Sequence, residues 1–274
     1  MLKLTVVQLE PMLTLTLGNW RWRWLHFLIT FIIDTKNSLL YKQVMTWENS
    51  RLFYGIDSNS KNELGAIIRK KNLKKDEALF YYEDKGSAVY IVESGQIKIS
   101  RETQDGVESV IYIAGNGDLI GKNLLFGDSQ YSYNASALAE AEVFVISLPE
   151  LRIVMKSSDA ILNNAAQILI ERNALLQKEI EHIKVQSAPQ RIGCFILGNC
   201  GKSGGKASFE LPFEKGVIAA KLGMKPETFS RALSELKKQG VKVEGKEVVV
   251  ESVEKLSAYT CSACSDSFPC PDVA

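Results

Sequence analysis

Residues 217–240 constrain the fold of this chain more than any other stretch; they read VIAAKLGMKPETFSRALSELKKQG. At about 100° per residue, the second half of this stretch places its apolar side chains on one helix face, namely Phe229, Ala232, Leu233 and Leu236. The opposite face is polar and carries Glu227, Ser230, Arg231, Ser234 and Lys238. The pattern predicts an amphipathic helix with one face in a core and the other directed outward.

Residues at both ends of this predicted helix support its boundaries. Pro226 suits the first helical position, because an N–H there would have no intrahelical partner. Glu227 is favourable near the positive end of the helix dipole, and Gly240 suits a C-terminal cap. The helix is therefore well bounded.

The segments on either side complete a recognisable motif. A short apolar helical turn precedes the helix, formed by Ile218, Ala219 and Leu222. Gly223 then permits the tight bend between two helices. After Gly240, VKVEGKEVVVES alternates around Glu244 and Gly245 as a β-hairpin does. The sequence predicts a winged helix-turn-helix over residues 188–258.

The pattern IAxxLG followed by PETFSRxLxxLxxxG resembles the Crp/Fnr family of bacterial transcription regulators. The resemblance implies that Glu227, Ser230 and Arg231 read base edges, as E-x-x-S-R does in Fnr-type members. Their chemistry agrees, since a carboxylate accepts from cytosine N4 and a guanidinium donates to guanine O6 and N7. The implied partners are double-stranded DNA with a palindromic operator of TTGAT-like half-sites, and RNA polymerase.

Lysines around the motif could attract DNA phosphates, which positions a protein without specifying sequence. They are Lys215, Lys221, Lys225, Lys237, Lys238, Lys242 and Lys246, of which Lys225 and Lys238 are our candidate contacts beside the reading helix. For each individual lysine, a solvated surface role is the default over a defined phosphate contact. The formal net charge of the chain is +1, so DNA affinity must come from local clustering.

Residues 45–150 show the dense turns and short strands of an antiparallel roll, after a helical stripe expected over residues 63–75. Residues 88–92 and 96–100 are β-rich, and glycines punctuate the region. The segments AVYIVESGQIKI and GDLIGKNLLFGD resemble the cyclic-nucleotide-binding β-roll (jelly roll) of the same family. The fold class implied is α+β, with roll, long helix and winged helix-turn-helix in that order.

The roll departs from members that bind cyclic AMP. In those members a glutamate follows the glycine of GDLIG and an arginine precedes a serine downstream, where this chain has Lys122 and Tyr131–Ser132. A cyclic phosphate buried without a cation would be poorly compensated. The sequence therefore argues against cyclic AMP as the effector.

Residues 151–187 carry a heptad seam typical of a helix that pairs with a second copy. Its members are Leu162, Ala166, Leu169, Asn173, Leu176, Ile180 and Ile183. A second strip could pack on the chain's own roll, formed by Ile161, Ala165, Ile168 and Leu175. We expect a homodimer. His182, beside the seam, is either a haem ligand or a plain surface histidine, and the surface role is the default.

Cys261, Cys264 and Cys270 stand in a C-x2-C-x5-C arrangement within the tail, residues 259–274. Thiolates at this spacing can bind zinc or an iron–sulfur cluster, although no fourth ligand is identifiable. The spacing resembles the Fnr branch with C-terminal cluster cysteines, which implies an oxygen-labile [4Fe–4S] cluster and an oxygen or nitric oxide sensor. Zinc, a thiol redox switch and a functionless tail stay as alternatives. Cys194 is read as a core residue.

Composition limits the remaining possibilities. The 274 residues are 46% hydrophobic and 24% charged, as in ordinary soluble proteins. Two histidines and no nucleophile–base set argue against an enzyme. Five cysteines without a credible signal peptide indicate the cytoplasm. Residues 1–44 contain an apolar run too short to span a membrane and are expected to be an extension of uncertain reality.

The sequence thus predicts a homodimeric transcription regulator that responds to oxygen, nitric oxide or redox state. The alternative is an effector-binding protein that acts on a partner protein instead of DNA.

Overall fold

The computed structural model describes residues 46–200, 205–265 and 268. Met45–Ala274 forms one compact unit. The expected extension, residues 1–44, and Cys270 lie outside the described residues. Among the described helices, none is both long and apolar enough to cross a membrane.

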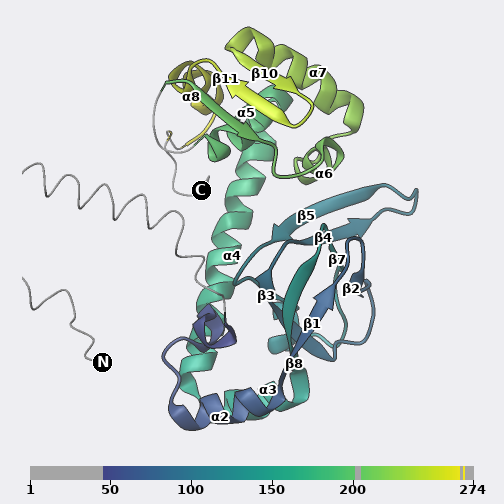
Figure 1. Cartoon of the computed structure of the whole chain (residues 1–274), viewed down its shortest axis with the longest axis vertical. Coiled ribbons are helices and arrows are strands. Elements are labelled where there is room, and N and C mark those ends of the chain that lie inside the picture. Colours follow the sequence, from purple (N-terminus) through teal and green to yellow (C-terminus); the bar gives the residue numbers. More distant parts are fainter. Residues whose placement is uncertain (1–45, 201–204, 266–267, 269–274) are drawn as a thin grey trace, which may run out of the picture. The chain divides into compact units, whose positions relative to one another are not determined.

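An antiparallel β-roll follows three helical segments: η3 (Trp47–Asn49), η4 (Arg51–Phe53) and α2 (Ser58–Ile67). Its strands are β1 (Ile68–Leu73), β2 (Ala78–Phe80), β3 (Ala88–Ser94), β4 (Ile97–Glu102), β5 (Glu108–Ala114), β6 (Leu119–Ile120), β7 (Asn134–Ala137) and β8 (Ala141–Ser147), with η5 (Lys122–Leu125) after β6. One sheet has the order β1-β8-β3-β6 and the other β2-β7-β4-β5 (Figure 1). The predicted roll is confirmed.

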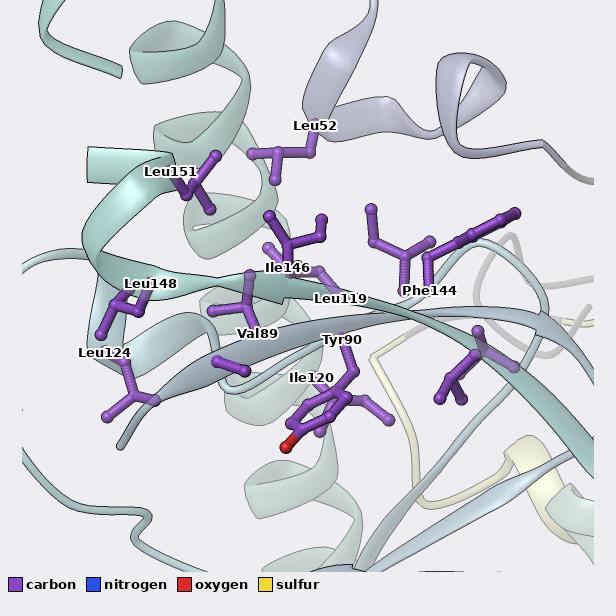
Figure 2. Close-up of a cluster of buried hydrophobic side chains, with 14 of the residues drawn as sticks. Leu52, Val89, Tyr90, Leu119, Ile120, Leu124, Phe144, Ile146, Leu148 and Leu151 are labelled. Atoms are coloured by element: carbon purple, nitrogen blue, oxygen red, sulfur yellow. The ribbon is translucent and has the colours of Figure 1, made fainter. Parts of the chain in front are cut away.

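Apolar side chains from both sheets form the core of the roll, part of which Figure 2 shows. β3 lies between β8 and β6, and all but its last residue are buried. Val89 of β3 and Ile146 of β8 are fully buried beside Leu151 of α3 (Leu148–Ser157). Each such side chain contributes about 1.5–3 kcal/mol relative to an exposed position. The roll therefore carries a continuous core.

The helical stripe expected over residues 63–75 is only half right. α2 ends at Ile67, and β1 then pairs with β8 from Ile68↔Ile146 to Leu73↔Ala141. Ile68 and Leu73 are buried, and the two residues after Ile68 are exposed. Pairing with a buried strand overrides the local helical spacing here, as tertiary context commonly does.

The long helix α4 (Asp159–Val185) is continuous, as Figure 1 shows. Ile161 and Ala165 are buried against the roll, and Ile168 is partly buried there. The Asn164 amide donates to the carbonyls of Leu52 and Tyr54 at 3.1 and 2.8 Å. Large apolar side chains elsewhere on α4 are 37–67% exposed, namely Leu162, Ile170, Leu175, Leu176, Ile180 and Ile183. Leu175, expected against the roll, is among these exposed residues.

The remaining elements form a second core. They are α5 (Ala188–Asn199), β9 (Ala207–Glu210), α6 (Lys215–Lys221), α7 (Pro226–Leu236), η6 (Lys237–Gln239), β10 (Val241–Glu244), β11 (Glu247–Val250) and α8 (Val253–Cys261). Ser187 and Gln190 form a capping box that begins α5 two residues after α4 ends. Gly193 allows α5 and α8 to approach, because a Cβ there would lie 2.4 Å from Thr260 Oγ1. The sequence did not lead us to expect α8.

Candidate functional site

The outward face of α7 presents the predicted reading residues together. Phe229, Ala232 and Leu236 are buried, and Leu233 is half-buried. Glu227, Ser230 and Arg231 are exposed on the other side, and Glu227 and Arg231 lie one helical turn apart. No described side chain forms an ion pair with either of these two. A free carboxylate and a free guanidinium can therefore meet base edges without first breaking an internal contact.

The turn before α7 fixes how that helix begins. Gly223 has φ of 65°, a left-handed conformation that favours glycine. The Met224 N–H donates to the Ala219 carbonyl at 2.9 Å, and Met224 is buried. Lys225 is the N-cap residue in extended conformation, followed by Pro226 at the first helical position. The turn thus joins α6 to α7 as a helix-turn-helix requires.

The wing forms as predicted. β10 and β11 pair from Val241↔Val250 to Glu244↔Glu247, and β11 also pairs with β9. Gly245 sits in the connecting turn with φ of 59°. Gly240, with φ of 83°, ends the helical stretch before β10.

Four of the seven predicted phosphate lysines fall into two groups. Lys225 and Lys238 are exposed at opposite ends of the α7–η6 stretch, which suits DNA contact. Lys242 and Lys246 are instead paired with Glu251 and Glu214, at 2.8 and 2.6 Å. Hydrogen bonds to these carboxylates raise the pKa of both lysines. To bind DNA, Lys242 and Lys246 would have to give up their carboxylate partners for a phosphate. They are therefore poorer candidates for phosphate contact than Lys225 and Lys238.

In the roll, Tyr131 occupies the place where the resemblance expects an arginine. Its ring stacks on Phe80 with centroids 3.6 Å apart, and its hydroxyl donates to the Ala88 carbonyl at 2.7 Å. The side chain is 2% exposed. Tyr131 therefore fills a buried position, and it brings no positive charge for a cyclic phosphate.

Lys122, in place of the expected glutamate, is half-buried with Nζ 3.4 Å from the Leu119 carbonyl. Its ammonium also lies 4.9 Å from the ring centroid of Tyr112, and the guanidinium of Arg172 lies 4.4 Å from the same centroid. Burial, followed by the charge of Arg172, lowers the pKa of Lys122 to about 8. The charge of Asp118 opposes this shift, and position 122 itself carries a cation in place of the carboxylate that would accept a ribose hydroxyl.

The C-terminal cysteine segment contacts the end of α4. Cys261 is the last residue of α8, and its carbonyl accepts from the Cys264 N–H at 3.1 Å. Sγ of Cys264 lies 3.5 Å from Nε2 of His182. The Ser265 N–H donates to the Glu181 carboxylate at 3.1 Å. Two adjacent residues of the segment thus meet two adjacent residues of α4.

The donor set is chemically suited to a thiophilic metal, but the described part of the chain does not complete it. Cys264 and His182 supply sulfur and nitrogen, the ligand types that zinc prefers. No three side chains of His, Cys, Asp or Glu converge on one point within the described ranges. A closed site would need a further ligand, and Cys270 lies outside those ranges.

Two other cysteines lie away from this segment. Cys200 donates its thiol to the Ile196 carbonyl at 3.3 Å, and burial raises its pKa to about 11. Cys194 is half-buried on α5. A half-buried thiol with a raised pKa is a poor nucleophile and metal ligand, so Cys200 is a poor sensor candidate.

Comparison with known proteins agrees with both halves of this architecture. The cyclic nucleotide-binding domain model matches residues 70–158, and the Crp-like helix-turn-helix domain model matches residues 190–259. The chain belongs to the Crp/Fnr family of transcription regulators. Members of this family regulate transcription and are not enzymes.

Relatives of this Crp/Fnr regulator include proteins with different names. It is 24% identical over 194 residues to the cyclic AMP receptor protein of Thermus thermophilus, covering 71% of this chain and 88% of that one. It is 26% identical over 211 residues to the fumarate and nitrate reduction regulatory protein of Salmonella typhimurium, covering 75% and 84%. The structure of the c-di-GMP responsive global regulator of Xanthomonas campestris has the same fold, with TM-score 0.61, 20% identity, and coverage of 71% and 99%.

His182 is the residue of this Crp/Fnr regulator whose setting the sequence did not reveal. It stands 82 residues before Cys264, and no spacing rule connects them. The sequence indicated only that His182 lies in the last turns of the long predicted helix. That end of the helix is the part that the segment after the wing contacts.

Proposed function

We propose that this Crp/Fnr regulator is a homodimer that reads a palindromic operator and senses oxygen, nitric oxide or redox state through its C-terminal cysteines. The contact between Cys264 and His182 carries the sensing part of the proposal, because it links the cysteine segment to the long helix. DNA binding itself follows from the helix-turn-helix of the family.

The reading residues proposed are Glu227, Ser230 and Arg231, with Lys225 and Lys238 on phosphates. Their exposure and the lack of an ion-pair partner for Glu227 and Arg231 in the described chain support this assignment. A side chain that is bidentate to a base discriminates against the wrong base by about 1–3 kcal/mol. Two such helices in a dimer would enter major grooves about one helical turn apart. RNA polymerase is the further partner, and the cytoplasm the location, that we infer from the family.

The exposed apolar face of α4 supports the homodimer. Leu176, Ile180 and Ile183 repeat at spacings of four and three, and they are 37%, 51% and 59% exposed in the single chain. Contiguous apolar surface of this kind marks interaction sites in soluble proteins. A second copy of α4, packed along this face, would cover it.

The roll supports a signal other than cyclic AMP. Tyr131 is buried against Phe80, and Lys122 is directed at Tyr112, so the two positions that hold the ligand in cyclic-AMP-binding members have other roles. We propose that Cys261, Cys264 and Cys270 form the sensor, with His182 as a further donor. When bound, a [4Fe–4S] cluster would supply a redox-active centre, and oxygen would destroy that cluster. Zinc would instead supply a redox-inert cross-link between its ligands.

Anaerobic purification tests the sensing proposal. The protein should contain iron and acid-labile sulfide, or zinc, and its operator affinity measured by fluorescence anisotropy should change after exposure to air. Cys264→Ser should remove this response, and Cys200→Ser, the matched control, should retain it. Metal-free protein with the same operator affinity under reductant and in air would overturn the proposed sensor.

A further inference from the structure

A cavity of about 660 Å³ lies among the end of α4, helices α5 and α6, and strand β5. This volume is within the range of small-molecule sites in proteins, roughly 300–1,000 Å³. Apolar side chains make much of its wall, namely Val110, Ile111, Ile183, Phe195, Phe213 and Leu222. An occupant would therefore contact apolar surface contributed by several elements.

Two polar groups in the wall lack partners. Gln186, between α4 and α5, is 6% exposed, and its Oε1 has no hydrogen-bond partner among the described residues. Nε of Arg191, at the start of α5, is likewise buried without a partner in the described part of the chain. Both residues line the cavity. Buried polar atoms are nearly always hydrogen-bonded, so this part of the wall is under-paired and would gain hydrogen bonds if a ligand shifted these two side chains and supplied partners.

The cavity also carries an excess of positive charge. Lys221 lines it with Nζ 5.9 Å from the ring centroid of Phe195 and 6.0 Å from that of Phe213. Although the Lys221 side chain keeps contact with solvent, desolvation around its ammonium lowers its pKa. A bound anion would reverse that effect by stabilising the charged form.

Of the described residues that line the cavity, Glu179 alone has a carboxylate. Its Oε1 lies 3.5 Å from Nη1 of Arg172, so this negative charge already has a cationic neighbour. Arg191 and Lys221 are then left to face the cavity without a carboxylate in hydrogen-bond contact among the described side chains.

We infer that this cavity binds an anionic, largely apolar small molecule whose charged group pairs with Arg191 and Lys221 and whose apolar body lies against Phe195 and Phe213. A carboxylate, sulfonate or phosphate would provide the acceptors that these two cations require. The site is separate from the roll positions of Lys122 and Tyr131. It adjoins the proposed cysteine sensor, because His182 also lines the cavity. Because α6 is the first helix of the helix-turn-helix, the ligand would touch the DNA-binding domain directly.

Two fluorescent probes with the same ring system test the inference. They are 1-anilinonaphthalene-8-sulfonate, which is anionic, and N-phenyl-1-naphthylamine, which lacks the sulfonate. The full-length protein should bind one anionic probe per chain, about tenfold or more tightly than the neutral probe, since a charged hydrogen bond is worth at least that factor.

Arg191→Met and Lys221→Met keep an apolar stem and remove the charge. Each should weaken the anionic probe about tenfold and leave the neutral probe within roughly twofold of the parent protein. Lys156→Met, at an exposed lysine of α3 away from the cavity lining, is the matched control and should change neither affinity. Circular dichroism checks that each variant is folded. If Arg191→Met unfolds, Lys221→Met alone tests the inference, because Lys221 is exposed and its substitution should not disturb the core. Equal affinity for both probes, or an anionic affinity unchanged in Lys221→Met, would overturn the inference.

Discussion

Nε2 of His182, near the end of α4, lies 3.5 Å from Sγ of Cys264, which follows α8. The next pair along, Glu181 and the Ser265 N–H, is hydrogen-bonded at 3.1 Å. Gln190 of α5 adds a bond from its amide to the Tyr259 carbonyl at 3.2 Å. The segment after the wing is therefore held to the long helix and to the first helix of the DNA-binding domain, and chemistry at Cys264 acts where these elements meet.

As a metal donor, His182 should contribute to Co²⁺ binding by the metal-free protein prepared anaerobically. His182→Ala should lower the Co²⁺ affinity at least about tenfold, because the loss of a group that only supports a metal ligand already costs about that factor. The visible absorption of bound Co²⁺ reports both affinity and ligand type. His182→Cys should restore binding, because a thiolate also ligates such metals. Cys200→Ser is the control and should bind as the parent does. Unaltered Co²⁺ binding in His182→Ala would remove His182 from the ligand set.

Cys200 should be alkylated slowly by iodoacetamide at pH 8, because burial raises its pKa to about 11 and the thiolate is the reactive form. Below that pKa the thiolate fraction, and hence the rate, should increase about tenfold per pH unit. Peptide mass spectrometry over a pH series measures the rate at each cysteine. A rate at pH 8 equal to that of an unhindered thiol would show that the pKa of Cys200 is not raised in solution.

Ile180→Glu should dissociate the dimer, because a carboxylate would be carried into an apolar interface from both chains. Burying unpaired charge should cost at least about 2 kcal/mol, or roughly 30-fold in the dimer dissociation constant. Analytical ultracentrifugation measures that constant. Gln177→Glu places the same charge on an exposed position of α4 outside the predicted seam and should have little effect. If both variants stay dimeric to the same degree, the seam is not the interface.

Tyr131→Arg should destabilise the roll and fail to create a cyclic AMP site. The guanidinium would replace a ring that is 2% exposed and stacked on Phe80, and an uncompensated buried charge costs about 3 kcal/mol or more. Tyr131→Phe, which removes only the hydroxyl and its hydrogen bonds with the Ala88 backbone and the Tyr90 hydroxyl, should cost about 1–2 kcal/mol. Urea denaturation gives both values. Near-equal losses would mean that position 131 tolerates charge and is not the filled core described above.

The sequence predicted those helices and strands in which buried residues recur at the spacing of a regular helix or a regular strand. The apolar face of α7, the glycine turn at Gly223 and the hairpin at Gly245 all follow from residue spacing and backbone preference, and the structure has all three. The order of roll, long helix and helix-turn-helix was predictable for the same reason, supported by the resemblance.

Features set by distant partners were not predictable in this way. The apolar residues at the end of α2 and in β1 follow one another at helical spacing. β1 is nevertheless a strand, because it pairs with β8. In a regular strand that buries Ile97 and Ile99, Ser100 would lie on the opposite face. Instead, a bulge after Ile99 in β4 shifts the register, and the buried Ser100 hydroxyl donates to Glu108 at 2.8 Å. His182 likewise meets Cys264 from 82 residues away, so this contact leaves no trace in the local sequence.

The reading face of α7 is tested most directly by titrating parent protein and Arg231→Ala onto a palindromic operator and onto copies with one base pair changed in each half-site. We expect Arg231→Ala to lose about 1–3 kcal/mol per half-site on the operator and to discriminate no longer at one base pair in each half-site. Lys238→Ala should instead weaken all sequences alike and reduce the salt dependence by about two counterions per dimer, one for each chain. Full discrimination by Arg231→Ala at every position would contradict the assignment of α7 as the helix that reads DNA.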